Sequence, residues 1–333
     1  RVSPDGRHVV RGYTVIQPSV SASLPSARAT WFSRIFADPR GIDPYTHAVS
    51  DVYQDLVGEG SYHGKGIYDL QTFHRLLSGR FPAAHLLSHD LLEGCYVRVG
   101  LATDIELLDV FPNSYIAWWS RQHRWIRGDW QIIDWLKSRV PVGGGRMEPN
   151  PLSAFNRWKI FDNLRRSLVP PAIMGLLLAG WFFTPVPMVW SGLIAVLIFW
   201  PILNAFLALL FHPPPPGTRF WRDPRDRLLR VIFAIIFLPD YAGMALDAIV
   251  RVTYRRITSH RLLLEWETAA DSHRRARSRE LQFILSRLWI PGVCVLLFVV
   301  ATSRGTTAMI AMTPFILLWA LFPLAVMMIN RPA

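Results

Sequence analysis

Cysteine is scarce in this sequence. Only Cys95 and Cys294 occur among its 333 residues, the first in a charged region and the second in an apolar run. Two isolated cysteines exclude a disulfide framework and a CxxC metal site. No signal peptide is visible at the N-terminus, and the chain begins at Arg1 without a methionine, so we expect it to be a piece of a longer protein.

Several nucleotide- and nucleic-acid-binding patterns are also missing. The glycine-dense segment 58–66 does not have the spacing of a Walker loop or of a dinucleotide-binding fingerprint. The net charge is +12, but no motif of a nucleic-acid-binding fold accompanies it. Most arginines of the C-terminal half flank apolar runs, so the lipid bilayer, and not nucleic acid, is the expected partner of this charge.

Apolar residues are abundant and unevenly distributed. Hydrophobic residues make up 51 % of the chain and the mean hydropathy is +0.23, which is more apolar than a soluble enzyme usually is. Residues 1–165 have the composition of a charged, soluble domain, whereas residues 166–333 alternate apolar runs with Arg-rich stretches. Four runs are candidates to cross a bilayer, near 168–184, 187–211, 288–302 and 306–329.

The positions of the arginines predict how these runs are oriented. The Arg-rich stretches 212–230 and 251–287 are expected in the cytoplasm and the two short turns outside, which gives two membrane hairpins. The apolar segment 229–250 has basic flanks and contains Asp240 and Asp247, so we predict an interfacial or re-entrant segment. An ordinary span with buried acids is the alternative.

Local patterns predict the elements of the N-terminal half. A strand is expected at residues 13–16, ending at Gln17-Pro18, and a second strand at 105–110. Apolar residues recur at helical spacing, with Ser88 as one N-cap, over residues 43–56, 68–77, 91–99 and 114–136.

Three segments carry candidate chemistry. Residues 121–130, RQHRWIRGDW, combine arginine forks that match a diphosphate with tryptophan faces that stack on sugars, although an interfacial helix has the same composition. Asp90 at a helix start, with Glu93 one turn later, suits a general base, although an isolated acid there more often only stabilises the helix dipole. The loop 58–66 permits close backbone approach to a ligand, or is a flexible surface loop.

The order of these segments resembles the second half of a family 2-like inverting glycosyltransferase with the GT-A fold. Gln17-Pro18, the glycine loop, Ser88-His89-Asp90 and residues 121–125 follow one another as the QP-type segment, the glycine loop, TED and Q(Q/R)xRW do in that family. The chain is most similar to the cyclic β-1,2-glucan synthases, glycosyltransferase family 84, from about residue 14 to the 260s. Four segments carry this resemblance: GIDPYTHAVSDVYQDLVGEGSYHGKGIYD, LLSHDLLEG, RQHRWIRGDWQ and HRLLLEWETAA.

This resemblance implies a multi-pass enzyme of the bacterial inner membrane, with its catalytic part in the cytoplasm. The intact protein would transfer glucose from UDP-glucose to a growing β-1,2-glucan with inversion. Asp90 is the implied base for the acceptor 2-hydroxyl, and Arg124, with Arg121 and Gln122, is implied to hold the diphosphate. Mg²⁺ or Mn²⁺ is implied as the cofactor. Acceptor contacts are implied for Trp125, Gly60, Ser61, His63 and Lys65.

The sequence departs from the family pattern in three places. Arg121 stands where the pattern has its first glutamine, and only the aspartate of TED is retained, as Asp90. No DxD precedes Gln17-Pro18, so no metal ligand is expected in this chain. The DxD and the uridine-binding half are expected upstream, and this piece alone is expected to be inactive.

The expected fold is therefore the C-terminal half of an α/β GT-A-like domain followed by an α-helical multi-pass membrane region. Its predicted parts are the catalytic part ending in an interfacial helix at 1–140, a linker at 141–165, a hairpin at 166–211, a cytoplasmic Arg-rich region at 212–287 and a second hairpin at 288–333. Two alternatives stay open: another β-glycan synthase of the cellulose-synthase-like type, and a non-catalytic membrane scaffold or glucan-export partner.

Overall fold

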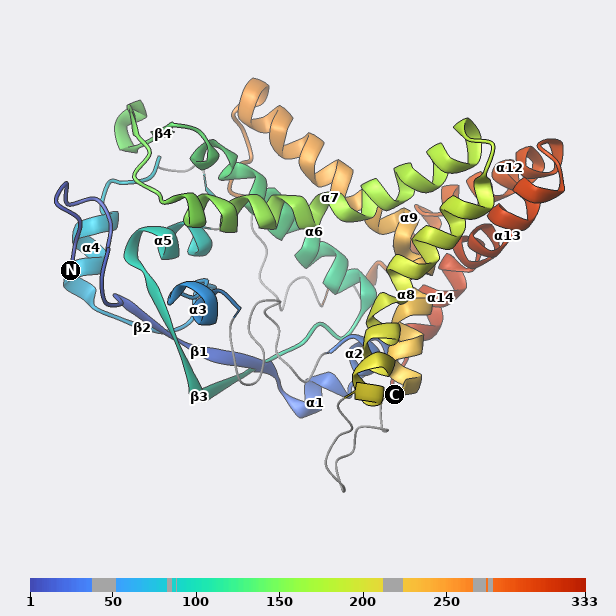
Figure 1. Cartoon of the computed structure of the whole chain (residues 1–333), viewed down its shortest axis with the longest axis horizontal. Helices are drawn as coiled ribbons and strands as arrows, with labels where there is room; N and C mark the ends of the chain where they lie inside the picture. The colour runs from blue at the N-terminus through green and yellow to red at the C-terminus, as the bar shows by residue number, and fades with distance from the viewer. Residues whose placement is uncertain (38–51, 83–85, 88, 212–223, 266–273, 275–277) are drawn as a thin grey trace.

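The structure is a computed structural model that describes residues 1–37, 52–82, 86–87, 89–211, 224–265, 274 and 278–333. The N-terminal part, residues 1–153, contains the strands and several short helices, and the helical part follows from residue 154 (Figure 1). The chain is mostly helical with a small sheet, which agrees with the expected membrane-associated architecture.

Three strands form the sheet in the order β2-β1-β3, with bounds β1 Val15–Ala22, β2 Ile67–Tyr68 and β3 Val99–Asp109. β1 pairs antiparallel with β2 and parallel with β3. The predicted strand end at Gln17-Pro18 is wrong, because β1 continues to Ala22. Pro18 cannot donate a ladder hydrogen bond, and the register with β3 shifts directly after it. The second strand begins earlier than predicted, at Val99.

The helices of the N-terminal part are α1 Leu24–Ala27, α2 Trp31–Phe36, α3 Val52–Val57, α4 Leu70–Leu77, α5 Asp90–Val97, α6 Tyr115–Gln131 and the 3-10 turns η1 Ile133–Leu136 and η2 Gly143–Gly145. η2 joins the short antiparallel strands β4 Arg139–Pro141 and β5 Met147–Pro149. The Ser114 hydroxyl caps α6 by accepting the Ala117 N–H at 3.2 Å. The predicted cap Ser88 and most of the helix predicted over 43–56 lie outside the described residues.

The core of the N-terminal part packs α5 between the sheet and the start of the helical part. Its apolar residues include Val15 and Val99 from the sheet, Leu92 and Tyr96 from α5, and Trp135 from η1. Trp135 is 1 % exposed, and its indole N–H donates to the Tyr96 hydroxyl at 3.1 Å. This packing fixes α5, and with it the position of Asp90, against the sheet.

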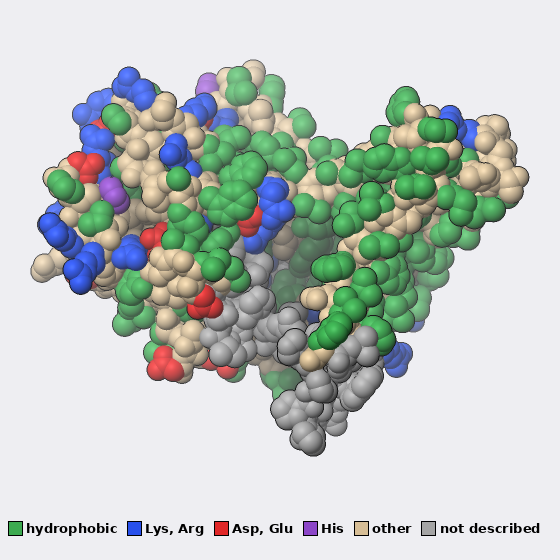
Figure 2. Space-filling view, in the orientation of Figure 1, with side chains coloured by type: hydrophobic (Ala, Val, Ile, Leu, Met, Phe, Trp, Pro, Cys, Tyr) green, Lys and Arg blue, Asp and Glu red, His purple; other side chains and the backbone are tan. Residues whose placement is uncertain are grey.

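The helical part consists of α7 Ala154–Phe183, α8 Pro187–Phe211, α9 Pro224–Tyr254, the π-helical turn η4 Arg255–Ser259, α11 Glu280–Leu285, α12 Trp289–Ser303, α13 Thr306–Ala320 and α14 Phe322–Ile329. Hydrophobic side chains cover much of its surface, whereas charged side chains gather over the N-terminal part (Figure 2). The segment predicted as a linker, 141–165, is helical from Ala154 onward and continues without a break into the first hairpin.

Among the described residues, four helices are long and apolar enough to cross a membrane, and the bent pair α13–α14, with an angle of 42°, brings the number to as many as five. The four are Ala154–Phe183, Pro187–Asn204, Arg225–Ser259 and Glu280–Ser303. These helices cover all the runs predicted to span, together with the segment predicted to be interfacial.

The turns of the two predicted hairpins lie side by side. The Arg304 guanidinium, between α12 and α13, lies 5.9 Å from the centre of the Phe182 ring at the end of α7. At the opposite end of the second hairpin, the Asn330 side chain accepts the Tyr115 N–H at 2.8 Å. The Trp31 N–H of α2 also donates to the Arg331 carbonyl at 3.0 Å. Both hairpins therefore point the same way, with the C-terminus against the N-terminal part (Figure 1).

Helix α9 is one continuous helix that contacts the N-terminal part at both ends. Near its start, Arg230 donates to the Ile35 carbonyl of α2. Just beyond its end, Arg256 forms an ion pair with Asp134 of η1. Along its length it packs on α6, where Asp240 accepts from the Tyr115 hydroxyl at 2.8 Å. These contacts favour an interfacial α9 over a span, and that placement stays a prediction.

Candidate functional site

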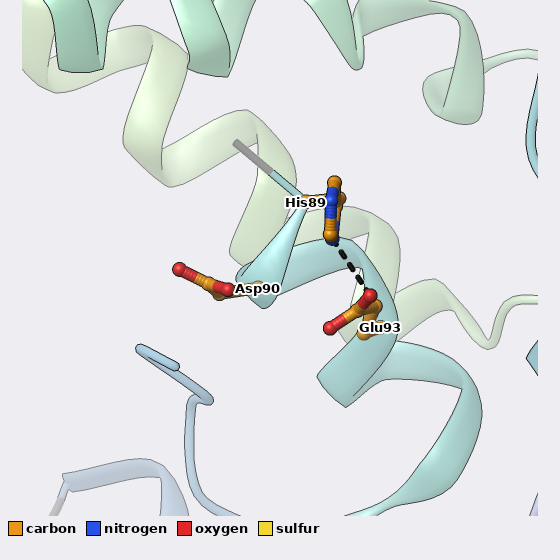
Figure 3. Close-up of side chains that lie close together, drawn as sticks. All are labelled: His89, Asp90 and Glu93. Atoms are coloured by element: carbon orange, nitrogen blue, oxygen red, sulfur yellow. Dashed lines mark ion pairs between the residues drawn. The ribbon is translucent and has the colours of Figure 1, made fainter. Parts of the chain in front are cut away.

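Asp90 is the first residue of α5 and is partly buried (Figure 3). Burial raises the pKa of Asp90 above its ordinary value, and the nearby Glu93 carboxylate raises it further. His89 and His63 oppose this effect. A partly desolvated carboxylate with a raised pKa is a better proton acceptor than an ordinary surface aspartate, which suits a general base.

The glycine loop packs directly on this carboxylate. A Cβ placed on Gly64 would lie 3.0 Å from Oδ2 and 3.2 Å from Oδ1 of Asp90. Gly64 also has a φ of +86°, a conformation that side chains rarely adopt. The structure thus brings two of the three predicted segments together, and only glycine fits at their contact.

Gln17 holds the middle of the loop. Its side chain is 1 % exposed, donates to the Ser61 carbonyl at 2.7 Å and accepts the His63 N–H at 2.9 Å. From the sequence, Gln17-Pro18 was recognised only as the QP-type segment. The buried Gln17 amide donates one hydrogen bond to the loop and accepts another from it, which explains why glutamine occupies this position on β1.

Lys159 of α7 holds the base of the loop. Its ammonium group is 3.0 Å from the Gly60 carbonyl oxygen and 3.0 Å from the Glu59 carboxylate. The Lys159 side chain is 2 % exposed. Gly60 and Ser61, two residues of this loop that are predicted to bind the acceptor, are buried, with Ser61 4 % exposed. Burial of this kind is typical of residues that stabilise a loop. No sequence pattern indicated Lys159 as a partner of this loop.

Lys65 connects the loop to the arginine helix. It forms an ion pair with Asp109 at the end of β3. Burial lowers the pKa of Arg121 on α6, and the nearby Asp109 charge opposes that effect. The charges of Lys65, Asp109 and Arg121 therefore link the glycine loop to the arginine helix.

The exposed tryptophan of α6 already has one partner. The Arg121 guanidinium lies 4.3 Å from the centre of the Trp125 ring. Trp125 is 36 % exposed, and Gln122 and Arg124 are partly buried on the same helix. A sugar that stacks on Trp125 would therefore share the ring with the Arg121 guanidinium.

Gln131, at the end of α6, joins the arginine helix to the segment that precedes Asp90. Its side-chain carbonyl accepts the Leu87 N–H at 2.5 Å, and its amide donates to the Leu263 carbonyl at 2.9 Å. Gln131 is 4 % exposed. One buried amide thus ties together three segments that carry the family resemblance.

His89 and Glu93 form an ion pair that the sequence analysis missed, with 2.7 Å between Nδ1 and the carboxylate (Figure 3). The i, i+4 spacing could have indicated it. With Asp90 they form a group of possible metal ligands whose donor atoms lie within 4.8 Å of one another. Because the Glu93 carboxylate already accepts a hydrogen bond from His89, this group alone is no argument for a metal ion.

No protein-family model matches the chain. The chain is similar to the cyclic β-(1,2)-glucan synthase NdvB of Rhizobium meliloti (strain 1021), with 38 % identity over 344 aligned positions. The alignment takes in 100 % of this chain and 12 % of that relative's length. This similarity confirms the predicted resemblance to a cyclic β-1,2-glucan synthase.

Proposed function

Because the whole chain is related to a segment of a cyclic β-(1,2)-glucan synthase, we propose that it is the acceptor-side and membrane-anchoring piece of a β-glucan synthase. The intact protein would be a membrane-bound inverting glucosyltransferase that uses UDP-glucose and forms β-1,2 linkages. Its N-terminal part would be the C-terminal half of a GT-A domain facing the cytoplasm, and its helical part would lie in the bacterial inner membrane.

The contact between Gly64 and the Asp90 carboxylate is the observation that carries this proposal. A Cβ on Gly64 would lie only 3.0 Å from Oδ2, so a backbone surface without a side chain forms one wall beside this partly buried carboxylate. An acceptor hydroxyl that lies on this wall would be within reach of the base. His63 precedes this glycine and Lys65 follows it, and we propose that both contact the acceptor sugar.

In the proposed reaction, Asp90 takes the proton of the acceptor 2-hydroxyl. The hydroxyl oxygen attacks the anomeric carbon of glucose from the face opposite the diphosphate, so the configuration inverts. Arg124, Arg121 and Gln122 of α6 would hold the leaving diphosphate, because guanidinium forks match its oxygens. Trp125 would stack on the acceptor sugar.

A divalent cation would neutralise the diphosphate in such an enzyme. The residues described here give no diphosphate-side ligand set, since Asp109 is already paired with Lys65. We therefore propose that the ligands of Mg²⁺ or Mn²⁺ lie mostly in the rest of the protein, and no step above passes through the ion.

The test is an Asp90→Asn variant of the full-length protein in membranes, supplied with UDP-glucose. We expect glucan formation to be lost while UDP-glucose still binds, because the amide cannot accept the proton. Turnover equal to that of the wild type would contradict the role of Asp90. Linkage analysis of the wild-type product separates a β-1,2-glucan from the product of a cellulose-type synthase, and no product at all would favour a scaffold.

A further inference from the structure

The His89–Glu93 pair is the charged cluster beside Asp90 that the proposed reaction does not yet use. The Glu93 carboxylate holds Nδ1 of His89 at 2.7 Å. The Glu93 side chain is 14 % exposed and that of His89 is 48 % exposed. The imidazole is therefore held at Nδ1 by a mostly buried carboxylate, while about half of the His89 side chain is accessible to solvent.

Asp90 stands between the two partners in sequence but points away from Glu93 (Figure 3). One donor atom from each of His89, Asp90 and Glu93 lies within 4.8 Å of the other two. A separation of this order suits one bridging water or hydroxyl. Since Nδ1 donates its hydrogen to Glu93, Nε2 is the ring nitrogen of neutral His89 that has a lone pair to accept a proton.

From this geometry we infer that Glu93 positions His89 to receive the proton that Asp90 removes from the acceptor hydroxyl. The inference rests on the proposed function. In this sequence the acceptor O–H bond breaks and Asp90 is protonated. The new C–O bond forms as the bond to the diphosphate breaks, and its electron pair leaves with the nucleoside diphosphate. Asp90 then passes its proton through the bridge to Nε2 of neutral His89, which releases it to solvent.

The charges around Asp90 agree with this direction of transfer. Among the described residues, the titratable groups that influence Asp90 are Glu93 and His89 on one side and His63 and Tyr62 of the loop on the other. The hydrogen bond that His89 donates to Glu93 raises the pKa of His89. An imidazole is ordinarily a stronger base than a carboxylate, and the Glu93 charge strengthens it further, which favours transfer of the proton from Asp90 to the imidazole.

The test measures kcat against pH for the full-length synthase with UDP-glucose. Because neutral His89 is the acceptor, wild-type kcat should rise with pH through the pKa of His89. Glu93→Gln removes the charge that raises this pKa, so the rise should move to lower pH, with kcat about 10- to 100-fold lower. The KM for UDP-glucose should not change, since neither residue contacts the donor.

His89→Gln should lose about 100-fold in kcat and lose the pH-dependent rise. Adding Glu93→Gln to this variant should cost no more than about twofold, because Glu93 acts through His89. The matched control is His74→Gln, an exposed histidine on α4, which should behave as wild type. If the two residues had only structural roles, the double variant would lose more kcat than His89→Gln alone.

Two outcomes would overturn the inference. One is that His89→Gln keeps the wild-type kcat and pH dependence. The other is that Glu93→Gln lowers kcat by the same factor whether or not His89 is present. If His89→Gln does not fold, the direction of the pH shift in Glu93→Gln decides alone. A wild-type protein that makes no glucan from UDP-glucose would instead refute the proposed function, so the two failures are distinguishable.

Discussion

Gly64→Ala is the substitution that tests most directly whether the loop and Asp90 form one site. The new methyl group would lie 3.0 Å from Oδ2, 3.1 Å from Cγ and 3.2 Å from Oδ1 of Asp90. These separations are shorter than ordinary van der Waals contact, so the carboxylate has to move. A displacement near 1 Å in a catalytic group costs about 100-fold in rate, and we expect that loss in kcat for glucan formation.

The same substitution also strains the backbone, and this effect has to be separated from the first. At a φ of +86° an alanine costs about 1–2 kcal/mol relative to glycine. Gly79→Ala is the matched control, because Gly79 has a φ of +66° and a Cβ there meets nothing within 4 Å. Both variants should lower the Tm by a similar few degrees, while only Gly64→Ala should lower kcat.

The assay compares kcat and thermal unfolding of the two full-length variants side by side. Equal kcat values for Gly64→Ala and Gly79→Ala would refute the reasoning, because the strain is shared and the contact with Asp90 is not. If the activity of Gly64→Ala is restored simply by assaying it at a lower temperature, the loss reflects reduced stability and not a change in the site.

Three further predictions follow from the contacts around the site. Lys159→Met should lower the free energy of unfolding by about 3 kcal/mol, because the Glu59 carboxylate loses one of its charged partners. Adding Glu59→Gln should recover part of this loss in thermal unfolding. No recovery would contradict the pairing of Lys159 with Glu59. Folding raises the pKa of Asp90, so the group's contribution to stability is present at acidic pH and is lost as the pH rises through the folded-state pKa. Asp90→Asn should therefore have a higher Tm than wild type at neutral pH, and an equal or lower value would contradict the burial effect. For the proposed topology, Val186→Cys in the first turn should react with an impermeant thiol reagent in spheroplasts. Thr258→Cys should react only after permeabilisation. Labelling of Thr258→Cys from outside would place α9 across the membrane.

The chemistry-bearing segments were predictable because their residue types carry the information locally. Asp90 at a helix start, the glycine loop and the arginine–tryptophan helix were all marked by composition and order. The structure places the first two in contact and connects the third through Lys65 and Asp109. Apolar runs bounded by arginine likewise predicted the long helices, since length and hydropathy decide what can cross a bilayer.

The residues that hold these segments in place were not predictable in the same way. Lys159 is separated from Gly60 by 99 positions and lies in a segment expected to be a linker. A buried lysine in such a segment has no local signature, because its partner is set by tertiary packing. The same is true of Asp240, whose partner Tyr115 is 125 positions away. The strand error at Pro18 has a different cause: proline usually ends a ladder, and here the register shift absorbs it.

Both halves of the candidate site are attached to α7, and the arginine helix is attached to α9 as well. Lys159 and Asn156 lie on α7, where Lys159 binds the base of the glycine loop and Asn156 donates to the Cys95 carbonyl of α5 at 3.2 Å. The side that carries Asp90 is thus fixed to the helix that continues into the first hairpin. The arginine helix α6 contacts the same helix, where the Trp130 indole N–H donates to the Ser167 hydroxyl at 2.9 Å, and it contacts α9, where His123 lies 2.7 Å from Asp247.

A shift between α7 and α9 would change the spacing between the base and the arginines, but the contacts of α6 with both helices and the direct packing of α7 on α9 resist it. Two contacts also join the halves directly: the ion pair of Lys65 with Asp109 beside Arg121, and the hydrogen bond from the Leu87 N–H to Gln131. The first is partly exposed, with side chains 38 % and 36 % accessible, and is weakened by solvent screening. The second is made by a buried amide, so of these two contacts the one at Gln131 should contribute more to the fixed spacing of the two halves.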